Sequence, residues 1–252
     1  MGRMVDIGVI FRPQMPPEDL RVAVTEAEAT GVSQLWLWED CFAEGGISAA
    51  AAALAWSRDL TVGIGLLPVP LRNPALTAME VATLARMFPG RVTVTLGHGV
   101  KPWMQQVGEG VDSPMTLLRE HAGAVAALLR GEEVTVRGRY VRLDHVRLDW
   151  PPASPPTLLI GARGPKTIAL AAELTDGVLL DQLTDPEPVR AARASVGDAH
   201  VALYTPFGAD ESPQDLFDRI ATLGEAGADT VVVHGTDDHP DHRRILAALA
   251  AR

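Results

Sequence analysis

The chain of 252 residues contains a single cysteine, Cys41, so no disulfide can form within it. One lone thiol is typical of a reducing compartment, which predicts a cytoplasmic protein. Long hydrophobic runs are also missing, because glycine, proline or charged residues interrupt each apolar stretch before it could span a membrane. The first residues follow a strand pattern and not a signal-peptide pattern. We therefore expect a soluble protein without a membrane partner.

Basic residues are too few for a nucleic-acid-binding protein. The 22 Lys and Arg residues are outnumbered by 32 Asp and Glu residues, which gives a formal net charge of −10. Nucleic-acid binding usually needs a basic face, so no such partner is expected, although a local pocket for a small anion is compatible with this charge. Hydrophobic residues make up 47% of the chain, enough for a full core in one large domain or two small ones.

Several catalytic motifs are absent as well. No glycine-rich turn carries the Walker lysine, and the spaced glycines of a dinucleotide-binding fingerprint are missing. Neither a Ser-His-Asp elbow nor a Cys-His pair is present. The histidines are scattered, and His239 and His242 have no further ligands near them in the sequence, so no metal site is predicted.

Strand patterns and helix patterns alternate along the whole chain. Near-continuous apolar segments predict eight buried strands, at residues 5–11, 33–38, 60–67, 91–97, 157–161, 177–181, 200–204 and 230–234. Helices are expected at residues 17–31, 47–56, 74–88, 165–174, 186–195, 213–226 and 240–251, with one more that begins at Pro114. Eight such units in about 250 residues predict an α/β fold, a closed (β/α)8 TIM barrel. An open doubly wound sheet is the alternative.

The alternation is interrupted once, at residues 131–156. Here "EEVTVRGRYVRLDHVRL" alternates like a β-hairpin about Arg137–Gly138, and the proline-rich "WPPASPP" returns the chain to the fifth strand. We interpret this segment as a decoration on one loop of a single domain that covers residues 1–252.

In a barrel of this kind the loops after the strands carry the site, and the turn after the fifth strand reads "GARGPK". Glycines let the backbone approach a ligand closely, and bare amides at the start of a helix attract an anion, most often a phosphate. An ordinary strand-to-helix turn is the alternative. The residues of this predicted anion site are Gly161, Ala162, Arg163, Gly164, Pro165 and Lys166.

Two further loops carry candidate chemistry. "LGHG" after the fourth strand places Gly97, His98 and Gly99 where a flat ring could lie against the backbone, or where the strand end simply bends. His98 is a candidate proton donor or a structural histidine. After the second strand, Glu39 and Asp40 project differently, so one carboxylate should point inward, where burial would raise its pKa. A helix cap or an ion pair is the alternative for this pair.

Taken in order, four segments resemble the luciferase-like monooxygenase superfamily. They are "LWLWEDCF", "GIGLLPVPLRNPALTAMEVATL", "GRVTVTLGHG" and "PPTLLIGARGPKTIALAAELTDGVLL". The similarity is closest to the branch of deazaflavin-dependent oxidoreductases, which use coenzyme F-420 and include methylene-tetrahydromethanopterin reductase. It covers nearly the whole chain apart from residues 131–156.

The resemblance implies a (β/α)8 barrel, usually a homodimer, with a flavin or deazaflavin at the C-terminal mouth. It implies a non-prolyl cis peptide at Gly65–Leu66 that backs the ring, and a ring-flanking loop at Gly97–Gly99. The turn at Gly161–Lys166 would hold the phosphate or tail of the cofactor. The expected anion is therefore the cofactor's own phosphate.

This sequence departs from the superfamily pattern in two places. Many members have an acidic residue followed by histidine after the second strand, whereas this chain has Glu39–Asp40. The chain also lacks the long insertion after the seventh strand that often covers the substrate, so the substrate cannot be inherited from relatives.

The resemblance thus predicts an oxidoreductase that transfers hydride between coenzyme F-420 and a small organic substrate. Glu39, Asp40 and His98 are its candidate catalytic residues. The alternatives are an FMN-dependent monooxygenase, a flavin-binding relative without catalysis, and an unrelated barrel isomerase with a phosphorylated substrate.

Overall fold

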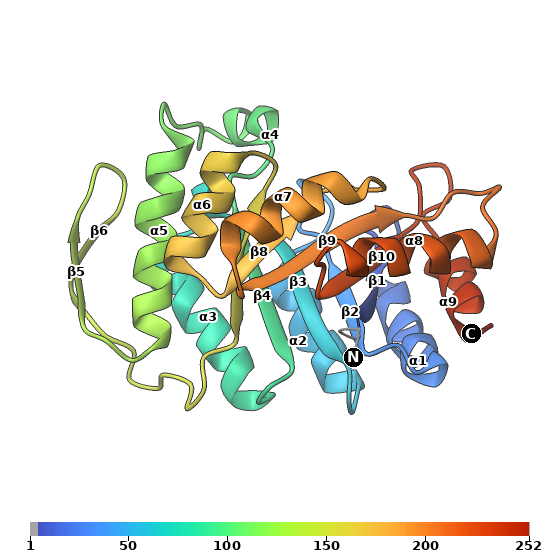
Figure 1. The fold of residues 1–252 in the computed structure, drawn as a ribbon. Coiled ribbons are helices and arrows are strands. Elements are labelled where there is room, and N and C mark those ends of the chain that lie inside the picture. The colour runs from blue at the N-terminus through green and yellow to red at the C-terminus, as the bar shows by residue number, and fades with distance from the viewer. Residues whose placement is uncertain (1–4, 252) are drawn as a thin grey trace.

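Eight parallel strands close into a barrel in the computed structural model, which describes residues 5–251 (Figure 1). Around the barrel the strand order is β1-β10-β9-β8-β7-β4-β3-β2. Their bounds are Asp6–Phe11 (β1), Gln34–Leu37 (β2), Thr61–Pro68 (β3), Val92–Gly97 (β4), Thr157–Ala162 (β7), Gly177–Leu180 (β8), His200–Pro206 (β9) and Thr230–His234 (β10). Because β1 pairs with both β10 and β2, the sheet has no edge there, and the open-sheet alternative is wrong. The predicted (β/α)8 barrel is confirmed.

Helices cover the outside of the barrel between successive strands (Figure 1). They are α1 (Leu20–Thr30), α2 (Gly46–Trp56), α3 (Pro74–Met87), α5 (Pro114–Leu129), α6 (Pro165–Leu174), α7 (Pro186–Val196), α8 (Pro213–Glu225) and α9 (His242–Ala250). Proline opens α3, α5, α6, α7 and α8, at the position where a missing N–H is harmless. The six-residue helix α4 (Lys101–Gln106) in the β4–α5 loop was not predicted, because it is too short to show a period. Short 3-10 turns lie at Pro17–Asp19 and Val69–Leu71.

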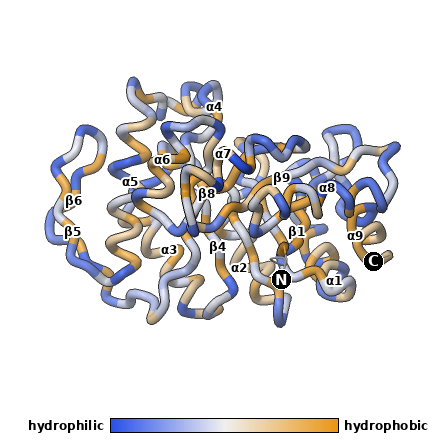
Figure 2. Tube along the Cα trace, in the orientation of Figure 1, coloured by the Kyte–Doolittle hydropathy of each residue, from blue (hydrophilic) through white to orange (hydrophobic). Residues whose placement is uncertain are grey.

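Apolar side chains form two cores. The larger one lies between the strands and the helices, and the smaller one fills the barrel, where Trp36, Trp38 and Tyr204 pack with Ile10 and Leu179. Figure 2 shows the same division along the chain, with hydrophobic residues concentrated in the strands and hydrophilic residues in many connecting loops. The barrel is therefore a packed core whose free space is confined to its ends.

The two strands outside the barrel, β5 (Val134–Arg137) and β6 (Arg142–Val146), form an antiparallel hairpin within the segment predicted as a decoration. The hairpin lies beside α5, away from the barrel (Figure 1). Glu120 of α5 accepts hydrogen bonds from the backbone amides of Arg139, Tyr140 and Val141, at 2.8, 2.9 and 2.9 Å. This one carboxylate fastens the hairpin turn to the helix.

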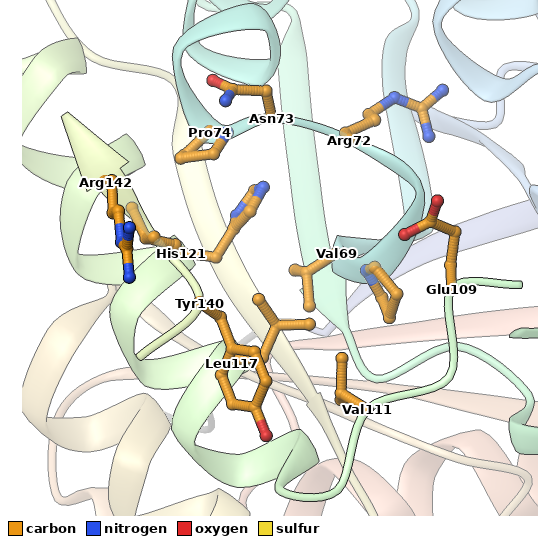
Figure 3. A pocket seen from close by; sticks show the side chains of 12 residues that line it. Val69, Arg72, Asn73, Pro74, Glu109, Val111, Leu117, His121, Tyr140 and Arg142 are labelled. Atoms are coloured by element: carbon orange, nitrogen blue, oxygen red, sulfur yellow. The ribbon is translucent and has the colours of Figure 1, made fainter. Parts of the chain in front are cut away.

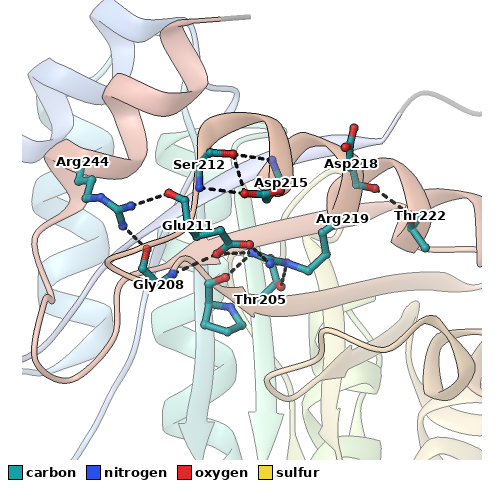
Figure 4. Close-up of polar contacts among 10 residues, drawn as sticks. Thr205, Gly208, Glu211, Ser212, Asp215, Asp218, Arg219, Thr222 and Arg244 are labelled. Atoms are coloured by element: carbon teal, nitrogen blue, oxygen red, sulfur yellow. Dashed lines mark hydrogen bonds and ion pairs between the residues drawn. The ribbon is translucent and has the colours of Figure 1, made fainter.

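On the other side of the barrel, polar contacts fix the loop between β9 and α8 (Figure 4). Ser212 and Asp215 form a capping box at the start of α8. Arg219 of the same helix pairs with Glu211, and Arg244 of α9 donates to the backbone oxygen of Glu211 at 2.7 Å. The loop is therefore held by two helices.

Two non-prolyl peptide bonds are cis, Gly65–Leu66 and Cys41–Phe42. The first was predicted and is confirmed, and the second was not predicted. Among residues 5–251, no helix is long and apolar enough to cross a membrane.

Candidate active site

The carboxyl ends of β2, β3, β4, β7, β8 and β9 surround a cavity of about 620 Å³. This is the end of the barrel at which the sequence placed the site. The cavity is lined by parts of four predicted loops: Trp38–Asp40, Gly65–Pro68, His98–Trp103 and Gly161–Gly164. The cavity thus gathers residues that lie far apart in the sequence.

The Leu66 side chain forms part of the cavity wall and packs over two glycines. A Cβ atom on Gly97 would lie within 3.0 Å of Leu66, and one on Gly161 would lie 2.6 Å from it. On the opposite strand, Tyr204 donates a hydrogen bond of 2.7 Å from its hydroxyl to the backbone oxygen of Gly65. A Cβ atom on Gly65 would overlap that hydroxyl. Close approach of a side chain therefore favours glycine at all three positions.

This packing gives Gly97 a different role from the one predicted. The sequence suggested that a ring could lie against its backbone, but Leu66 fills the space beside Gly97, and Gly97 is not among the residues that line the cavity. Its neighbours fit the prediction better. Gly99 lines the cavity with a φ of 69°, which favours glycine, and His98 lines it as well. Burial lowers the pKa of His98, with the Pro114 carbonyl opposing that shift, so a neutral imidazole faces the cavity.

The predicted anion site lies at the start of α6. Gly164 is the N-cap residue and offers no side chain to the first turn. Pro165 has no N–H, and the Thr167 amide donates to the Gly164 carbonyl at 3.1 Å, which leaves the Lys166 amide of this turn available to a ligand. Gly161, Ala162, Arg163 and Gly164 line the cavity.

The rest of this turn differs from the prediction. Pro165 and Lys166 are exposed and lie outside the lining. The hydroxyl-bearing Thr167, the third residue of α6, lines the cavity and was missed, because a single threonine inside a helix gives no signal in the sequence. Arg163 is 84% exposed and pairs with Asp181 at the end of β8.

Glu39 and Asp40 project differently, as the sequence suggested. Glu39 is 8% exposed, accepts hydrogen bonds from the Gly46 amide at 2.6 Å, and forms a two-point ion pair with the Arg72 guanidinium. This geometry matches the ion-pair alternative for Glu39. Both residues line the cavity, but the carboxylate of Glu39 is taken up by Arg72 and Gly46, whereas that of Asp40 has no such partner among the described residues. Burial raises the pKa of Asp40, and the nearby charges of Arg12 and Asp181 act in opposite directions, the first lowering and the second raising it.

Trp38, Tyr204 and Asp181 are among the lining residues that were not chosen as candidates from the sequence. Trp38 and Tyr204 form the inner wall, with ring centroids 5.4 Å apart, and Asp181 lies at the end of β8. Asp181 follows an apolar strand, so its position after β8 was the available signal. Tyr204 lies within a strand, and only the closed barrel shows that it points across the lumen.

A second, smaller cavity of about 200 Å³ lies between the start of α3, α5 and the β5–β6 hairpin (Figure 3). His121 of α5 is 1% exposed there, and burial lowers its pKa to about 4. Arg72 lines this cavity and pairs with Glu39 of the first one, so one ion pair separates the two spaces. No group of His, Cys, Asp and Glu side chains within residues 5–251 could hold a metal ion.

The chain is similar in sequence to a known protein family and to several characterised enzymes. The family model described as luciferase-like monooxygenase matches residues 8–215. The 5,10-methylenetetrahydromethanopterin reductase of Archaeoglobus fulgidus is 29% identical over 214 residues, which are 85% of this chain and 62% of that protein. The F-420-dependent glucose-6-phosphate dehydrogenase of Nakamurella multipartita is 28% identical over 180 residues, which are 66% of this chain and 52% of that protein. The chain therefore spans less than two thirds of the length of either relative.

Solved structures share the fold at low identity. The coenzyme F-420-dependent tetrahydromethanopterin reductase of Methanopyrus kandleri has a TM-score of 0.84 at 18% identity, and the match covers 98% of this chain and 97% of that one. An F-420-dependent secondary alcohol dehydrogenase in complex with an F-420–acetone adduct gives 0.86 at 18% identity, with coverage of 98% and 97%. These likenesses show the barrel fold.

Proposed function

Because this chain belongs to the luciferase-like monooxygenase family, we propose that it is an oxidoreductase that uses coenzyme F-420 and acts on a small organic substrate. The two relatives compared by sequence above are a 5,10-methylenetetrahydromethanopterin reductase and an F-420-dependent glucose-6-phosphate dehydrogenase, both of them oxidoreductases by name. The observation that carries the proposal is the cavity of about 620 Å³ at the C-terminal mouth, with an apolar wall at one side and an uncapped helix start at the other.

The residues present fit a cofactor with a flat ring and an anionic tail. Leu66, supported on Gly97 and Gly161, offers an apolar surface for the ring. The α6 start, with Gly164 as an uncapped N-cap, offers the Lys166 amide to a phosphate, and Thr167, whose hydroxyl donates to the Met115 sulfur at 3.5 Å, lines the cavity on the same turn. Arg163 adds a positive charge on the same turn. When bound, the deazaflavin supplies the hydride chemistry, and the protein supplies orientation and proton handling.

Proton handling falls to the groups that face the cavity. The Asp40 side chain makes no hydrogen bond to any of residues 5–251, and burial raises its pKa, which favours a carboxyl group that can hold and release a proton at the cavity. His98 is neutral and can donate or accept a hydrogen bond at the same cavity. Glu39 supports the site differently: its ion pair with Arg72 fixes the end of β2 against the start of α3, one residue from Asp40.

Hydride transfer with the purified protein tests this proposal. Reduced coenzyme F-420 would be offered with a panel of ketones, aldehydes and imines, and the oxidised form with the corresponding alcohols and amines, while the absorbance of the deazaflavin is followed. We expect substrate-dependent oxidation or reduction that is roughly 10²-fold slower in Asp40→Asn. Tight cofactor binding with no transfer to any substrate would favour the alternative of a flavin-binding relative without catalysis.

An FMN-dependent monooxygenase is the second candidate, since the family takes its description from such enzymes. Reduced FMN, oxygen and the same substrate panel distinguish it, because this alternative consumes oxygen and inserts it into the product. An isomerase with a phosphorylated substrate is the third candidate, and it would bind neither ring.

We also propose that the chain acts as a cytoplasmic homodimer. Leu76, Met79 and Met87 follow one face of α3 and are 45%, 55% and 62% exposed. Exposed apolar side chains at this spacing are typical of a helix that packs against a partner. Sedimentation of the wild-type protein and of Met79→Glu measures it: the wild type should be a dimer and the variant a monomer with an unchanged fold.

A further inference from the structure

An arginine is buried beside the cavity and takes no part in the predicted site. Arg12, at the C-terminal end of β1, is 3% exposed. It donates to the backbone oxygen of Gly235 at 2.6 Å and to Asp237 at 2.5 Å. Its guanidinium carbon lies 5.1 Å from the centre of the Trp38 ring, close enough for a cation–π contact. The guanidinium is thus fixed on three sides.

A contribution to stability does not explain why the Arg12 side chain is buried. A buried charge is costly unless it is paired, and the one carboxylate that Arg12 pairs with, Asp237, is 87% exposed. Its Nε atom is buried and makes no hydrogen bond among the described residues. The positive charge of Arg12 is therefore only partly neutralised at the place where Trp38 and Asp40 line the cavity.

Charged and titratable groups reach Asp40 from every side of the mouth. They are Arg12 after β1, Glu39 after β2 with Arg72, His98 after β4, Asp181 after β8 with Arg163, Tyr204 on β9, and His234 and Asp237 on β10 and the loop after it. Arg12 is the cation among them whose charge acts directly on Asp40 and lowers its pKa, while Asp181 raises it. Arg12 also lowers the pKa of His234.

We propose that Arg12 is a positioning residue for the oxidoreductase site: it holds the Trp38 ring as a wall of the cavity, and it keeps a fixed positive charge behind Asp40. This role rests on the proposed function, in which Asp40 handles the proton, but the contacts exist without a cofactor. The guanidinium stacks on Trp38, and its positive charge opposes the effect of Asp181 on Asp40. Burial raises the pKa of the Asp40 carboxyl group, and the charge of Arg12 limits that rise.

The test is a carboxyl ¹³C NMR titration of the protein without cofactor, in which the Asp40 signal is identified by its loss in Asp40→Asn. The Trp38 indole signal, identified by its loss in Trp38→Phe, reports the cavity wall. Arg12→Gln removes the charge and keeps a similar length, and Arg12→Lys keeps the charge without the planar stack. Arg244→Gln is the matched control, because Arg244 stacks on Phe207 at 4.1 Å and donates to backbone oxygens, but on the outer loop.

Arg12→Gln should move the Asp40 midpoint to higher pH by at least about half a unit and should shift the Trp38 signal. Arg12→Lys should shift the Trp38 signal but leave the midpoint nearly in place, and Arg244→Gln should change neither. An unchanged or lower midpoint in Arg12→Gln, or an equal shift in Arg244→Gln, overturns the role of Arg12.

A second variant keeps the test decisive if Arg12→Gln does not fold. Asp237→Asn removes an exposed carboxylate that partly neutralises Arg12, so the Asp40 midpoint should move to lower pH, opposite to Arg12→Gln. A midpoint that stays in place or rises overturns the proposal. These NMR signals are measured without cofactor, so they do not depend on the outcome of the hydride-transfer assay. The role of Arg12 and the proposed oxidoreductase function can therefore be refuted independently.

Discussion

Replacing Gly97 by alanine tests whether Leu66, and not the cofactor, fills the space above the end of β4. The added methyl group would lie within 3.0 Å of the Leu66 side chain, closer than real Cβ contacts allow. Leu66 is held from the other side as well, because Gly161 lies beneath it. Overpacking of this kind costs about 1–3 kcal/mol of stability. For a chain of this size, that corresponds to a fall in Tm of roughly 2–10 °C.

The comparison needs a glycine that faces open space on the same side of the barrel. Gly164 is that control, since a Cβ atom there would meet nothing within 4 Å and its φ of −133° suits any residue. Gly164→Ala should therefore unfold within about 0.5 kcal/mol of the wild type. Adding Leu66→Ala to Gly97→Ala should recover part of the loss, because the shorter side chain makes room for the methyl group.

Denaturant unfolding of these four proteins and of Leu66→Ala alone measures these differences, and titration with coenzyme F-420 measures the consequence for binding. We expect Gly97→Ala to weaken the cofactor through displacement of Leu66, with no direct contact to Gly97. Equal stability of Gly97→Ala and Gly164→Ala, or a double variant no more stable than the sum of its single losses, would refute the packing argument.

Three further changes separate the roles of single groups. Gly164→Val should weaken binding of coenzyme F-420 by at least 10-fold with little change in Tm, because the valine side chain would contact the bound anion and no protein atom. Unchanged affinity would show that the turn has a structural role and does not bind the anion. Asp40→Asn should lower turnover by roughly 10²-fold with a small change in cofactor affinity. Glu39→Gln should mainly lower Tm, since it breaks a buried ion pair. The opposite pattern would assign proton transfer to Glu39. Burial raises the pKa of Glu44 from 4.5 to about 7, so ionisation opposes folding and the wild type loses stability as pH rises through this range. Glu44→Gln should therefore raise stability by an amount of the order of 2 kcal/mol at pH 8 and by little at pH 4, and equal gains at both pH values would contradict the assignment.

The barrel could be predicted because its signal is local and repeated. Each strand is an apolar segment of its own, and proline at the first helical position marks five helix starts without reference to the rest of the chain. Placement of the site at the strand ends follows from the fold class, which is why the turn at Gly161–Gly164 and the Asp40 loop were found.

The sequence could not predict contacts between residues that lie far apart along the chain. Glu39 pairs with Arg72, 33 positions away, and Tyr204 reaches Gly65 across 139 positions. Neither pairing has a periodic signature, so the carboxylate that faces the cavity could not be chosen from the pair Glu39–Asp40. The role of Gly97 could not be predicted for the same reason. The absence of a side chain at Gly97 makes room for Leu66, which only the closed barrel brings beside it.

The dissociation constants of coenzyme F-420 and FMN for the purified wild-type protein test the central claim most directly. Binding can be followed by quenching of tryptophan fluorescence, because Trp38 and Trp103 line the cavity. We predict that coenzyme F-420 binds at least 10-fold more tightly than FMN, and that Gly164→Val removes most of this binding. Tighter binding of FMN would contradict the deazaflavin assignment, and no binding of either ring would contradict the account as a whole.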